Sequence, residues 1–588
     1  LDDREPAVEY NPHSEPELEP IAEELETPMD DPVGVDDPAG VDVPAHSEPT
    51  AAPEPQPVKI ERQESAGVRR SSRVKFQTKA PYVPSMTGSK YSVAVTQLES
   101  HGTLHPDAHA SFFQHVMEEE PDIVAAIMTQ LSLKAGLKEW GTEARDAVKS
   151  EMKQLHMRNT FKPKHWKELS ETQRQCILES HLFLKQKRDG SIKGRTVAGG
   201  NKQRDFISKE DASSPTVATE SVLLTCIIDA EEERDVAVVD IPNAFIQTKI
   251  EDEKDMAIIK IRGILVDILL EIAPEVYKEY VTTDKKGNKQ LITQCLNAIY
   301  GTMVASLLYY FKFCRTLKRE GFKMNPYDPC VANRMVDKKQ QTVCFHVDDC
   351  KLSHKDPKAN DRLIKALKDE YESIFEDGSG EMKVSRGKVH EYLGMTLDYS
   401  VKGQVKITML GYINEILDLF EQLDPESIGT KASAAPSNLF TVDDSSPKLG
   451  KKQAEQFHKL VAKTLFATKR ARPDTGTAIS FLSTRVREPD EDDWRKLAYL
   501  MKYVRGTKEL PLILSANGSG MLKWFIDGSH GVHPNMRGHT AGGVPMGRGF
   551  LTAPSTKQNS NTRRSTETET AALDDLMQPT LCTRLSLD

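Results

Sequence analysis

The feature that most constrains the fold is an apolar segment that runs into two adjacent carboxylates, Asp348 and Asp349. Residues 341–353 read Q-T-V-C-F-H-V-D-D-C-K-L-S, so a second strand-like segment leaves directly after the acids. Two short strands joined in this way predict a tight hairpin with the carboxylates at its turn. Adjacent strand residues point to opposite faces, but a tight hairpin lets the second carboxylate swing towards the first.

A second strand-like segment ends on an acid in the same way. Residues 236–245 read V-A-V-V-D-I-P-N-A-F, with Asp240 at the end of the apolar run and Phe245 five residues later. Three carboxylates at neighbouring strand ends ionise together only at high cost unless cations neutralise them. Oxygen ligands suit Mg²⁺, and two such ions about 4 Å apart clamp the attacking and leaving oxygens of phosphoryl transfer. We therefore expect Asp240, Asp348 and Asp349 to bind two Mg²⁺ ions, with Mn²⁺ as a substitute.

The Asp-Asp pair alone carries little weight, because solvated loops and helix faces explain its other occurrences. What distinguishes 348–349 is the pair of flanking strands together with the Asp240 segment. The pair also occurs at 30–31, 36–37, 443–444, 492–493 and 574–575.

Charge and proline are unevenly distributed along the chain. Residues 1–65 hold 19 Asp and Glu but 3 Lys and Arg, together with 12 of the 33 prolines. A segment of this composition buries too little apolar surface to offset its ordering entropy, so we expect a disordered, acidic, Pro-rich linker over 1–100. The remaining residues carry a net charge of +6, which permits a nucleic-acid partner without establishing one.

Two features near this linker have alternative interpretations. The basic run at 69–75, R-R-S-S-R-V-K, is typical of a solvated tether, and a nucleic-acid or nuclear-import contact is the alternative. Four histidines (His101, His105, His109 and His115) follow, but no Cys or carboxylate framework accompanies them, so no metal site is expected there.

Cysteine spacing and hydropathy bear on the cellular compartment and on membrane association. The eight cysteines form no CxxC pair and no zinc-like spacing, which predicts reduced thiols and an intracellular protein. Cys344 and Cys350 flank the Asp-Asp turn and are expected to pack inside the strands. No secretory signal opens the chain, and the most apolar run, 263–271, is short and charged, so no membrane partner is expected.

A charged hairpin is predicted ahead of the Asp240 strand. Strands at 181–187 and 194–198 would bring Lys185, Lys187 and Arg195 together. These cations could hold a triphosphate, and a charged surface hairpin is the alternative. Before the hairpin, residues 121–160 have helical periodicity with Trp140, Ala144, Val148 and Met152 on one face. After it, the sequence predicts helices at 217–231, 297–320, 405–423, 452–470 and 490–505, a strand at 522–529, and a helix from Ser565.

These segments belong to a series of blocks. V-V-D-I-P-N-A-F-I-Q-T is followed by L-N-A-I-Y-G-T-M-V-A-S-L-L-Y-Y, F-H-V-D-D-C and E-Y-L-G-M, and later by W-F-I-D-G-S and S-T-E-T-E-T-A-A. In this order the blocks resemble the reverse transcriptase and RNase H part of a copia-type LTR retrotransposon Pol polyprotein, over roughly 120–588.

The resemblance implies an α+β fold: a right-hand polymerase with fingers, palm and thumb, then connection helices and a partial RNase H-like α/β domain. The fingers and palm would occupy 120–400, and the thumb and connection helices 401–515. A truncated RNase H-like domain would occupy 520–588. The N-terminal acidic region would be the disordered linker that follows an integrase.

The resemblance also implies roles for the acids and their neighbours. Asp240, Asp348 and Asp349 would be the catalytic, metal-binding residues. Ile241 would offer its backbone carbonyl to a metal, and Phe245 would lie under the incoming sugar and exclude a ribose 2′-hydroxyl. Core packing is the other interpretation of Phe245, and the two roles are compatible.

The same blocks imply further binding residues. Lys185 and Arg195 would hold the nucleotide phosphates. In the RNase H remnant, Asp527 and Glu569 (or Glu567) would be the first two acids.

Three departures from the family pattern stand out. His346 replaces the usual Tyr before Val-Asp-Asp, and Val304 replaces a polar residue. The chain ends at Asp588, before the strand that would carry the third RNase H acid. We therefore expect 520–588 to be the least stable folded part and to lack RNase H activity.

The activity implied is RNA-directed DNA polymerase, with two-metal nucleotidyl transfer to a primer 3′-hydroxyl. An RNA template, a DNA primer and dNTPs would be its partners, with integrase and Gag of the same element as further ones, in a cytoplasmic particle or the nucleus. The alternative is a decayed, inactive copy that retains only nucleic-acid binding. His346, Val304 and the truncated end favour this alternative, and the intact acid triad argues against it.

Overall fold

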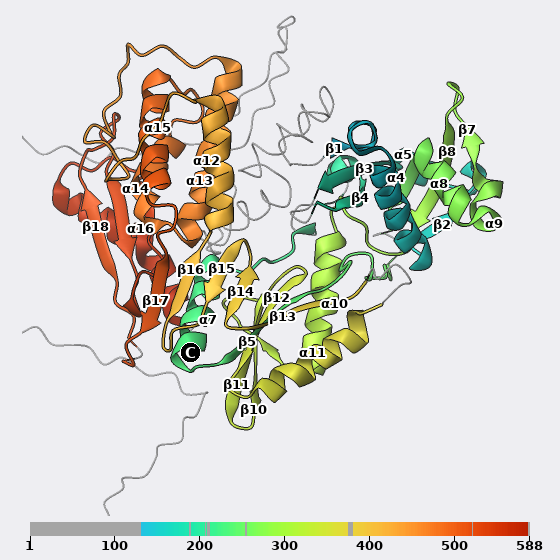
Figure 1. Cartoon of the computed structure of the whole chain (residues 1–588), viewed down its shortest axis with the longest axis horizontal. Coiled ribbons are helices and arrows are strands. Elements are labelled where there is room, and N and C mark those ends of the chain that lie inside the picture. Colours follow the sequence, from blue (N-terminus) through green and yellow to red (C-terminus); the bar gives the residue numbers. More distant parts are fainter. Residues whose placement is uncertain are drawn as a thin grey trace, which may run out of the picture. The chain divides into compact units, whose positions relative to one another are not determined.

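The computed structural model describes residues 131–585, with short gaps at 187–189, 206, 208–211, 253–255, 374–379 and 520 (Figure 1). Side chains beyond 577 are also outside the description. The acidic linker, the basic run at 69–75 and the four histidines therefore lie outside the described residues. Within them, helices and mostly antiparallel strands occur together, and the α+β prediction is confirmed.

The first sheet contains the predicted charged hairpin. Helix α4 packs on this hairpin and buries Ala144, Val148 and Met152, as their spacing predicted, while Trp140 of the same predicted face is half-buried. The strand order is β1-β3-β6-β8-β2, with β4 beside β3 and β7 beside β8. The elements are α4 (Leu133–Met157), α8 (Ile264–Ile272), β1 (Leu131–Ser132), β2 (Phe161–Pro163), β3 (Leu178–Gln186), β4 (Ile192–Ala198), β6 (Ile258–Arg262), β7 (Thr282–Thr283) and β8 (Lys289–Cys295).

The second sheet holds both acidic strands at its centre, in the order β13-β5-β12-β11-β10-β9. One face meets α7 through an ion pair between Lys351 and Asp229. The other meets α10, where the rings of Phe345 and Phe313 lie 4.8 Å apart. The elements are α7 (Thr219–Glu231), α10 (Ala305–Arg319), α11 (Pro357–Tyr371), β5 (Asp235–Asp240), β9 (Lys323–Met324), β10 (Val331–Val336), β11 (Lys339–His346), β12 (Asp349–His354) and β13 (Lys383–Gly387).

A third sheet and a group of helices follow. The sheet order is β14-β15-β16-β17-β20, and the E-Y-L-G-M block forms the β14–β15 hairpin. The elements are β14 (Val389–Tyr392), β15 (Met395–Asp398), β16 (Val405–Thr408), β17 (Leu512–Ala516), β20 (Gly547–Arg548), α12 (Leu410–Leu423), α13 (Lys451–Arg470), α14 (Gly476–Ser483) and α15 (Glu491–Gly506).

Two predicted helices begin later than expected. Residues 405–408 form strand β16, because V-K-I-T alternates with a period of two and pairs with neighbours on both sides. Residues 297–304 are irregular and α10 begins at Ala305. Gly301 has a φ of +85° and approaches Ala198 so closely that a Cβ would clash, so this segment cannot be helical.

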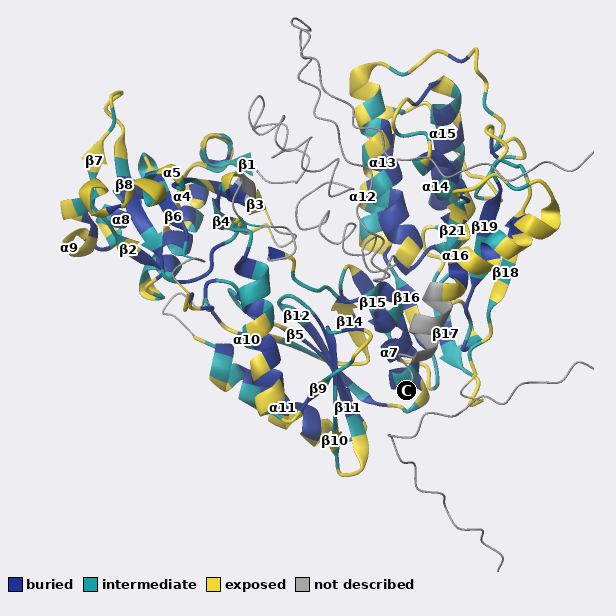
Figure 2. Cartoon of the chain, turned by 180° about the vertical axis from the view of Figure 1, so that it is seen from behind, coloured by how far each residue is buried: buried dark blue, intermediate teal, exposed yellow. Residues whose placement is uncertain are grey.

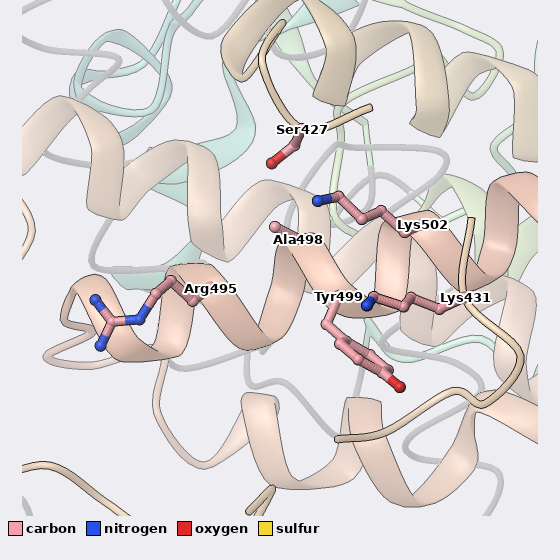
Figure 3. A pocket seen from close by; sticks show the side chains of 6 residues that line it. All are labelled: Ser427, Lys431, Arg495, Ala498, Tyr499 and Lys502. Carbon is pink, nitrogen blue, oxygen red and sulfur yellow. The ribbon is translucent and has the colours of Figure 1, made fainter. Parts of the chain in front are cut away.

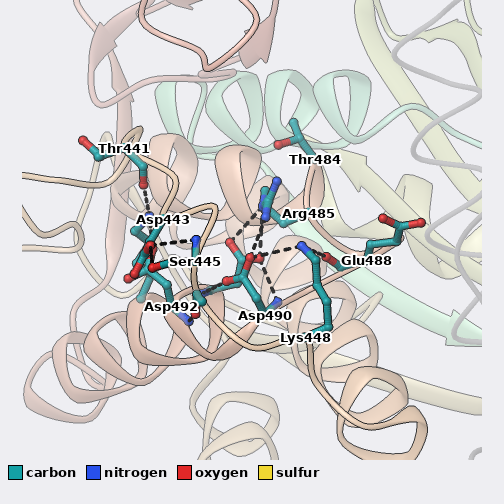
Figure 4. A network of polar contacts seen from close by, with 12 residues as sticks. Thr441, Asp443, Ser445, Lys448, Thr484, Arg485, Glu488, Asp490 and Asp492 are labelled. Atoms are coloured by element: carbon teal, nitrogen blue, oxygen red, sulfur yellow. Dashed lines mark hydrogen bonds and ion pairs between the residues drawn. The ribbon is translucent and has the colours of Figure 1, made fainter.

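The N-terminus of α15 is fixed by a polar network with the preceding loop (Figure 4). Asp490 and Asp493 form a capping box, in which each side chain accepts a hydrogen bond from the other residue's backbone N–H. Arg485 donates to both carboxylates, at 2.9 and 3.0 Å, and Lys448 lies 3.4 Å from Asp490. This network explains why the Asp492–Asp493 pair is structural.

The last sheet has the order β18-β19-β21, with α16 against β18 and β19. A Cβ on Gly528 would lie 2.8 Å from the carbonyl oxygen of Thr568, so glycine permits this close contact between strand and helix. Of the apolar residues of α16, Leu573 is exposed whereas Ala572 is buried. The elements are β18 (Phe525–Ser529), β19 (His539–Gly543), β21 (Ser555–Lys557) and α16 (Ser565–Leu585).

Burial follows these layers, with dark buried segments inside each sheet and helix group (Figure 2). Cys344 and Cys350 are buried and free, as predicted, and no disulfide occurs among the described cysteines. Across the part of the chain that the structure describes, none of the helices combines the length and apolar character needed to cross a bilayer.

Candidate active site

The two acidic segments meet in one antiparallel ladder. Asp240 at the end of β5 lies directly opposite Asp349 at the start of β12. On the outer strands, His346 of β11 pairs with Asp349, and Lys383 of β13 pairs with Asp240. Because directly opposed residues point to the same face of a sheet, these four side chains form one row across the four strands.

Asp240 and Asp349 form the closer kind of antiparallel pair. The Ile241 N–H donates to the Asp348 carbonyl oxygen at 3.0 Å, one residue outside the pair. This is the pattern of a non-hydrogen-bonded pair, whose Cα atoms are about 4.5 Å apart and whose side chains are close together. The backbone thus places these two carboxylates side by side.

The turn between β11 and β12 consists of Val347 and Asp348. Val347 has a φ of 53°, in the left-handed region that β-branched residues rarely adopt. Such a conformation costs about 1–3 kcal/mol and persists only where the surrounding structure enforces it. Strain of this kind at the tip of the acidic hairpin is an independent sign of a functional turn.

The carboxyl of Asp348 is electrostatically perturbed. Burial raises the pKa of its carboxyl above the ordinary value, and the charge of Asp240 raises it further. Arg195 and Lys193 of the charged hairpin act in the opposite direction. The half-buried Asp348 therefore holds a proton more readily than a solvated carboxyl does, and a bound cation would favour its charged form.

The side chains do not, however, converge as a ready-made metal site. Among the described residues, no group of three or more His, Cys, Asp or Glu side chains is arranged to hold a metal ion. The ladder brings the backbones of Asp240, Asp348 and Asp349 together and the charges of Asp240 and Asp348 interact. Convergence of all three carboxylates on a metal remains a prediction.

The charged hairpin contributes two cations near Asp348. Lys185 lies opposite Lys193, and Arg195 lies two residues beyond Lys193 on the same face of the hairpin. Lys193, which the sequence analysis missed, is the lysine whose charge acts on Asp348, while no such effect of the exposed Lys185 is found among the described residues. Lys187 lies outside the described residues.

Tyr300 contacts both Phe245 and Arg195, a role that no pattern in the sequence indicated. The Tyr300 ring lies 4.9 Å from the Phe245 ring, and the Arg195 guanidinium lies 5.3 Å from the Tyr300 ring. The Tyr300 carbonyl oxygen accepts a hydrogen bond from the Ala198 N–H at 2.7 Å, which ties this ring to the end of β4. Burial and the charge of Asp348 raise the pKa of Tyr300, so it stays a neutral phenol. Its position depends on a contact between distant segments, which no local pattern signals.

These residues lie inside a segment that is recognisable as a known domain. Residues 168–432 match the family described as reverse transcriptase (RNA-dependent DNA polymerase). The chain carries a reverse transcriptase domain of the copia type. The resemblance drawn from the sequence blocks is therefore confirmed.

Curated relatives are transposon proteins. A retrovirus-related Pol polyprotein from transposon TNT 1-94 of Nicotiana tabacum is 23% identical over 369 residues, covering 61% of this chain and 25% of that protein. The Ty1-DR1 Gag-Pol polyprotein of Saccharomyces cerevisiae is 21% identical over 439 residues, which cover 73% of this chain and 23% of that protein. A protein of transposon Ty5-1 from the same yeast is 24% identical over 259 residues, which cover 44% of this chain and 79% of that protein. The chain spans about a quarter of the two polyproteins.

Solved structures that match include a foamy viral protease-reverse transcriptase in complex with double-stranded DNA. It is 10% identical with a TM-score of 0.43, covering 76% of this chain and 62% of that one. Telomerase of Candida albicans is 12% identical with a TM-score of 0.23, and the match covers 59% of this chain and 63% of that one.

Two departures within the reverse transcriptase domain have clear structural settings. His346 is half-buried, and burial, together with the charge of Arg470, lowers its pKa to about 4. It is therefore neutral at pH 7, and its Nδ1 finds no hydrogen-bond partner among the residues that the structure describes. Val304 is buried at the start of α10.

Ile241, which follows Asp240 on the chain, is buried as well. That its backbone carbonyl binds a metal remains a prediction.

Outside the reverse transcriptase domain, the two expected RNase H acids lie on adjoining elements. Asp527 is on β18, and Glu569 is on α16. Both are exposed, and the contact at Gly528 brings their backbones close together. Glu567 instead accepts a hydrogen bond from the Arg563 N–H at 2.7 Å, as a residue capping the helix would. This contact favours Glu569 over Glu567 as the second acid.

Proposed function

We propose that the chain catalyses RNA-directed DNA synthesis at the β5–β12 ladder. The observation that carries this proposal is the Asp240–Asp349 pair, placed side by side next to Asp348, a half-buried carboxyl whose pKa is raised by burial and by the charge of Asp240. The catalytic acids would be Asp240, Asp348 and Asp349, on the palm. The domain boundaries proposed are those inferred above: fingers and palm at 120–400, thumb and connection helices at 401–515, and an RNase H-like part at 520–588.

The carboxylates provide the oxygen ligands that Mg²⁺ or Mn²⁺ prefers. When bound, two such ions supply Lewis-acid stabilisation of the attacking and leaving oxygens. The raised pKa of Asp348 means that its carboxyl holds a proton more readily than an exposed one. A cation that replaces this proton would relieve the repulsion with Asp240 and draw the three carboxylates together.

The surrounding residues suit a deoxynucleoside triphosphate. Arg195, with Lys193 and Lys185 on the same hairpin face, presents positive charge for the phosphate oxygens. Phe245, braced by Tyr300, offers an aromatic surface to the sugar. The proposed partners are an RNA template, a DNA primer and dNTPs, with Gag and integrase of the same element as assembly partners.

A decayed copy that only binds nucleic acid is the second candidate. The neutral His346 and the apolar Val304 favour it, because His346 replaces the tyrosine ring that would pack against the primer end and Val304 offers no polar contact to a nucleotide. The strained Val347 turn argues against it, since strain without function is expected to relax by mutation.

Primer extension by the purified chain on poly(rA)·oligo(dT) separates the two candidates. Asp349→Asn should lower the extension rate by at least about a hundredfold, because it removes a charge that acts in the transition state. Asp337→Asn is the matched control, since Asp337 lies at the turn of the neighbouring β10–β11 hairpin and is exposed. A folded wild-type chain without extension would support the decayed copy, and full activity of Asp349→Asn would refute the proposed site.

A further inference from the structure

A buried carboxylate outside the acid triad lies against the charged hairpin. Glu151 is on α4 and is only 7% exposed. Its Oε1 accepts a hydrogen bond from the Thr196 N–H at 2.9 Å. Thr196 is itself buried on β4 and follows Arg195 directly on the chain. Glu151 has no part in the nucleotidyl transfer proposed above, so its burial beside this strand calls for another explanation.

The contact satisfies a backbone group on the outer edge of β4. This strand has a neighbouring strand, β3, on one side only, so every second N–H of β4 points away from the ladder. The outward N–H of Thr196 meets the Glu151 carboxylate, and that of Ala198 donates to the Tyr300 carbonyl oxygen at 2.7 Å. Two distant parts of the chain therefore hold this edge at successive outward positions.

A glycine lets α4 approach β4 closely enough for this contact. A Cβ on Gly194 would lie 3.2 Å from the Ala147 carbonyl oxygen, closer than an ordinary van der Waals contact. On the other side of Arg195, the Thr196 hydroxyl lies 3.8 Å from the Met152 sulfur. Helix and strand therefore pack closely at the residues that flank Arg195.

Glu151 is also linked electrostatically to the hairpin cations. Burial raises the pKa of the Glu151 carboxyl, while the hydrogen bond from Thr196 and the charges of Lys193 and Arg195 act in the opposite direction. The same two cations lower the pKa of Asp348. Glu151 and the candidate active site thus share these two positive charges.

We propose that Glu151 is a positioning residue for the incoming nucleotide, an inference that rests on the function proposed above. By holding the outer edge of β4, Glu151 fixes the backbone from which Lys193 and Arg195 extend, so that both cations meet the triphosphate without a prior rearrangement. Such preorganisation strengthens binding, because less of the hairpin has to be ordered when the nucleotide arrives. In this role Glu151 touches neither nucleotide nor metal and acts only through the hairpin.

A second group of cations in the chain is the competing place for a triphosphate. A pocket of about 300 Å³ lies between one face of α15 and the loop that follows α12, and Lys431, Arg495 and Lys502 are among its lining residues (Figure 3). Figure 3 shows the Arg495 guanidinium turned away from the two lysines, so these cations do not converge as those of the hairpin do. Lys502→Ala alters this pocket and leaves the hairpin intact.

Extension kinetics of the full chain on poly(rA)·oligo(dT) test the proposal. Glu151→Ala should raise the KM for dTTP about tenfold and change kcat less than about twofold, because it weakens binding that is equal in the ground and transition states. Glu151→Gln keeps an acceptor for the Thr196 N–H, so its KM should stay within about twofold of the wild-type value. Arg195→Ala should also raise the KM, and adding Glu151→Ala to it should raise the KM no further, since one residue acts through the other.

Two controls separate positioning from stability and from the competing pocket. Asp490 is 2% exposed and accepts a hydrogen bond from the Asp493 N–H at 3.0 Å, the same kind of contact in another helix, α15. Asp490→Ala should lower the thermal unfolding temperature, as Glu151→Ala does, yet leave the KM for dTTP unchanged. Lys502→Ala should leave this KM unchanged as well.

Each outcome decides the inference. An unchanged KM in Glu151→Ala, or an equal rise in Glu151→Gln or Asp490→Ala, overturns it, and a rise confined to Lys502→Ala assigns the triphosphate to the α15 pocket instead. The Kd for dTTP is measured separately by equilibrium binding with Ca²⁺ in place of Mg²⁺, which requires no bond formation. A wild-type chain that binds dTTP without extending the primer refutes the polymerase proposal, and the Kd of Glu151→Ala then decides the inference. A wild-type chain that binds no dTTP overturns both.

Discussion

Lys351 and Asp229 form an ion pair in which the two side chains are 1% and 0% exposed. Lys351 lies on β12 two residues after Asp349, and therefore on the same face of the sheet. Burial lowers the pKa of Lys351, but the charge of Asp229, smaller contributions from Cys226 and Cys344, and the hydrogen bond to Asp229 together reverse this and raise the pKa above the ordinary value. Arg234 lies 3.9 Å from Asp229 and donates to the Thr342 hydroxyl on β11 at 3.0 Å. The pair thus joins α7 to the strands that carry the candidate acids.

Breaking this pair from one side should be severely destabilising. Asp229→Asn leaves the Lys351 ammonium buried without its countercharge, and we expect a loss of about 3–5 kcal/mol in the free energy of unfolding. Replacing both residues, by Asp229→Leu with Lys351→Met, should recover most of this loss. Urea unfolding curves measure all three chains. The exposed pair Glu233–Lys402 is the control, and Glu233→Gln should leave the midpoint unchanged; an equal loss there would contradict the assignment.

Phe245 is expected to determine the choice of sugar. Its ring contacts Tyr300 and, at 6.1 Å between ring centres, Tyr309, which hold it against the end of β5. Phe245→Ala should raise the ratio of kcat/KM for ribonucleotides to that for deoxynucleotides by at least about tenfold, because the bulk that excludes the 2′-hydroxyl is lost. An equal fall in both values would mean that the ring serves only in packing.

The strain at Val347 should be measurable. Val347→Gly removes the cost of a β-branched residue at positive φ, and we expect the free energy of unfolding to rise by about 1 kcal/mol. Lys338→Gly is the control, because Lys338 has a φ of 60° at the turn of the neighbouring hairpin but is not β-branched. A larger gain from Lys338→Gly would rule out special strain at the acidic turn. We also expect Val347→Gly to slow primer extension, since the freer turn holds Asp348 less firmly.

The C-terminal sheet should lose stability in mild acid. His533 and His539 are buried, with Nε2 of the first 3.1 Å from Nδ1 of the second, and Nε2 of His539 lies 2.8 Å from the Ser555 hydroxyl. Burial lowers both pKa values to about 4, and for His533 the neighbouring His539 and Lys557 act in the same direction.

The sign of the pH effect follows from these values. In the unfolded chain both residues titrate near 6.5, so the unfolded state binds more protons between pH 6.5 and 4. The stability that the neutral pair contributes is complete above pH 6.5 and is lost as the pH falls towards 4. We expect the melting temperature of the wild-type chain to fall on the order of 5 °C more over this range than that of His533→Phe with His539→Asn. Parallel curves for the two chains would contradict this.

Local sequence signals were sufficient for many elements of the fold. The alternation around Asp348 and the apolar run before Asp240 predicted two strands that the structure contains. The spacing of Ala144, Val148 and Met152 predicted the buried face of α4. The predicted starts of two helices were wrong. At Gly301 a glycine with positive φ interrupts the helical pattern, and in β16 pairing with neighbouring strands outweighs helical periodicity.

The candidate site was only partly visible in the sequence. Its acids stand at the ends of recognisable strands, and Arg195 lies within one. Lys193, Tyr300 and Lys383 escaped notice, because each owes its place to a contact between distant segments.

By itself, the sequence determined which residues form the acidic hairpin and the Asp240 strand, since strand periodicity and turn length are local properties of the chain. Only the tertiary structure decided that Asp240 lies opposite Asp349 in the ladder. A shift of one residue would turn every side chain of β5 to the other face, and nothing within β5 prevents it. The register is fixed by burial on both faces at once, with Lys351 paired to α7 on one side and Phe345 packed on α10 on the other.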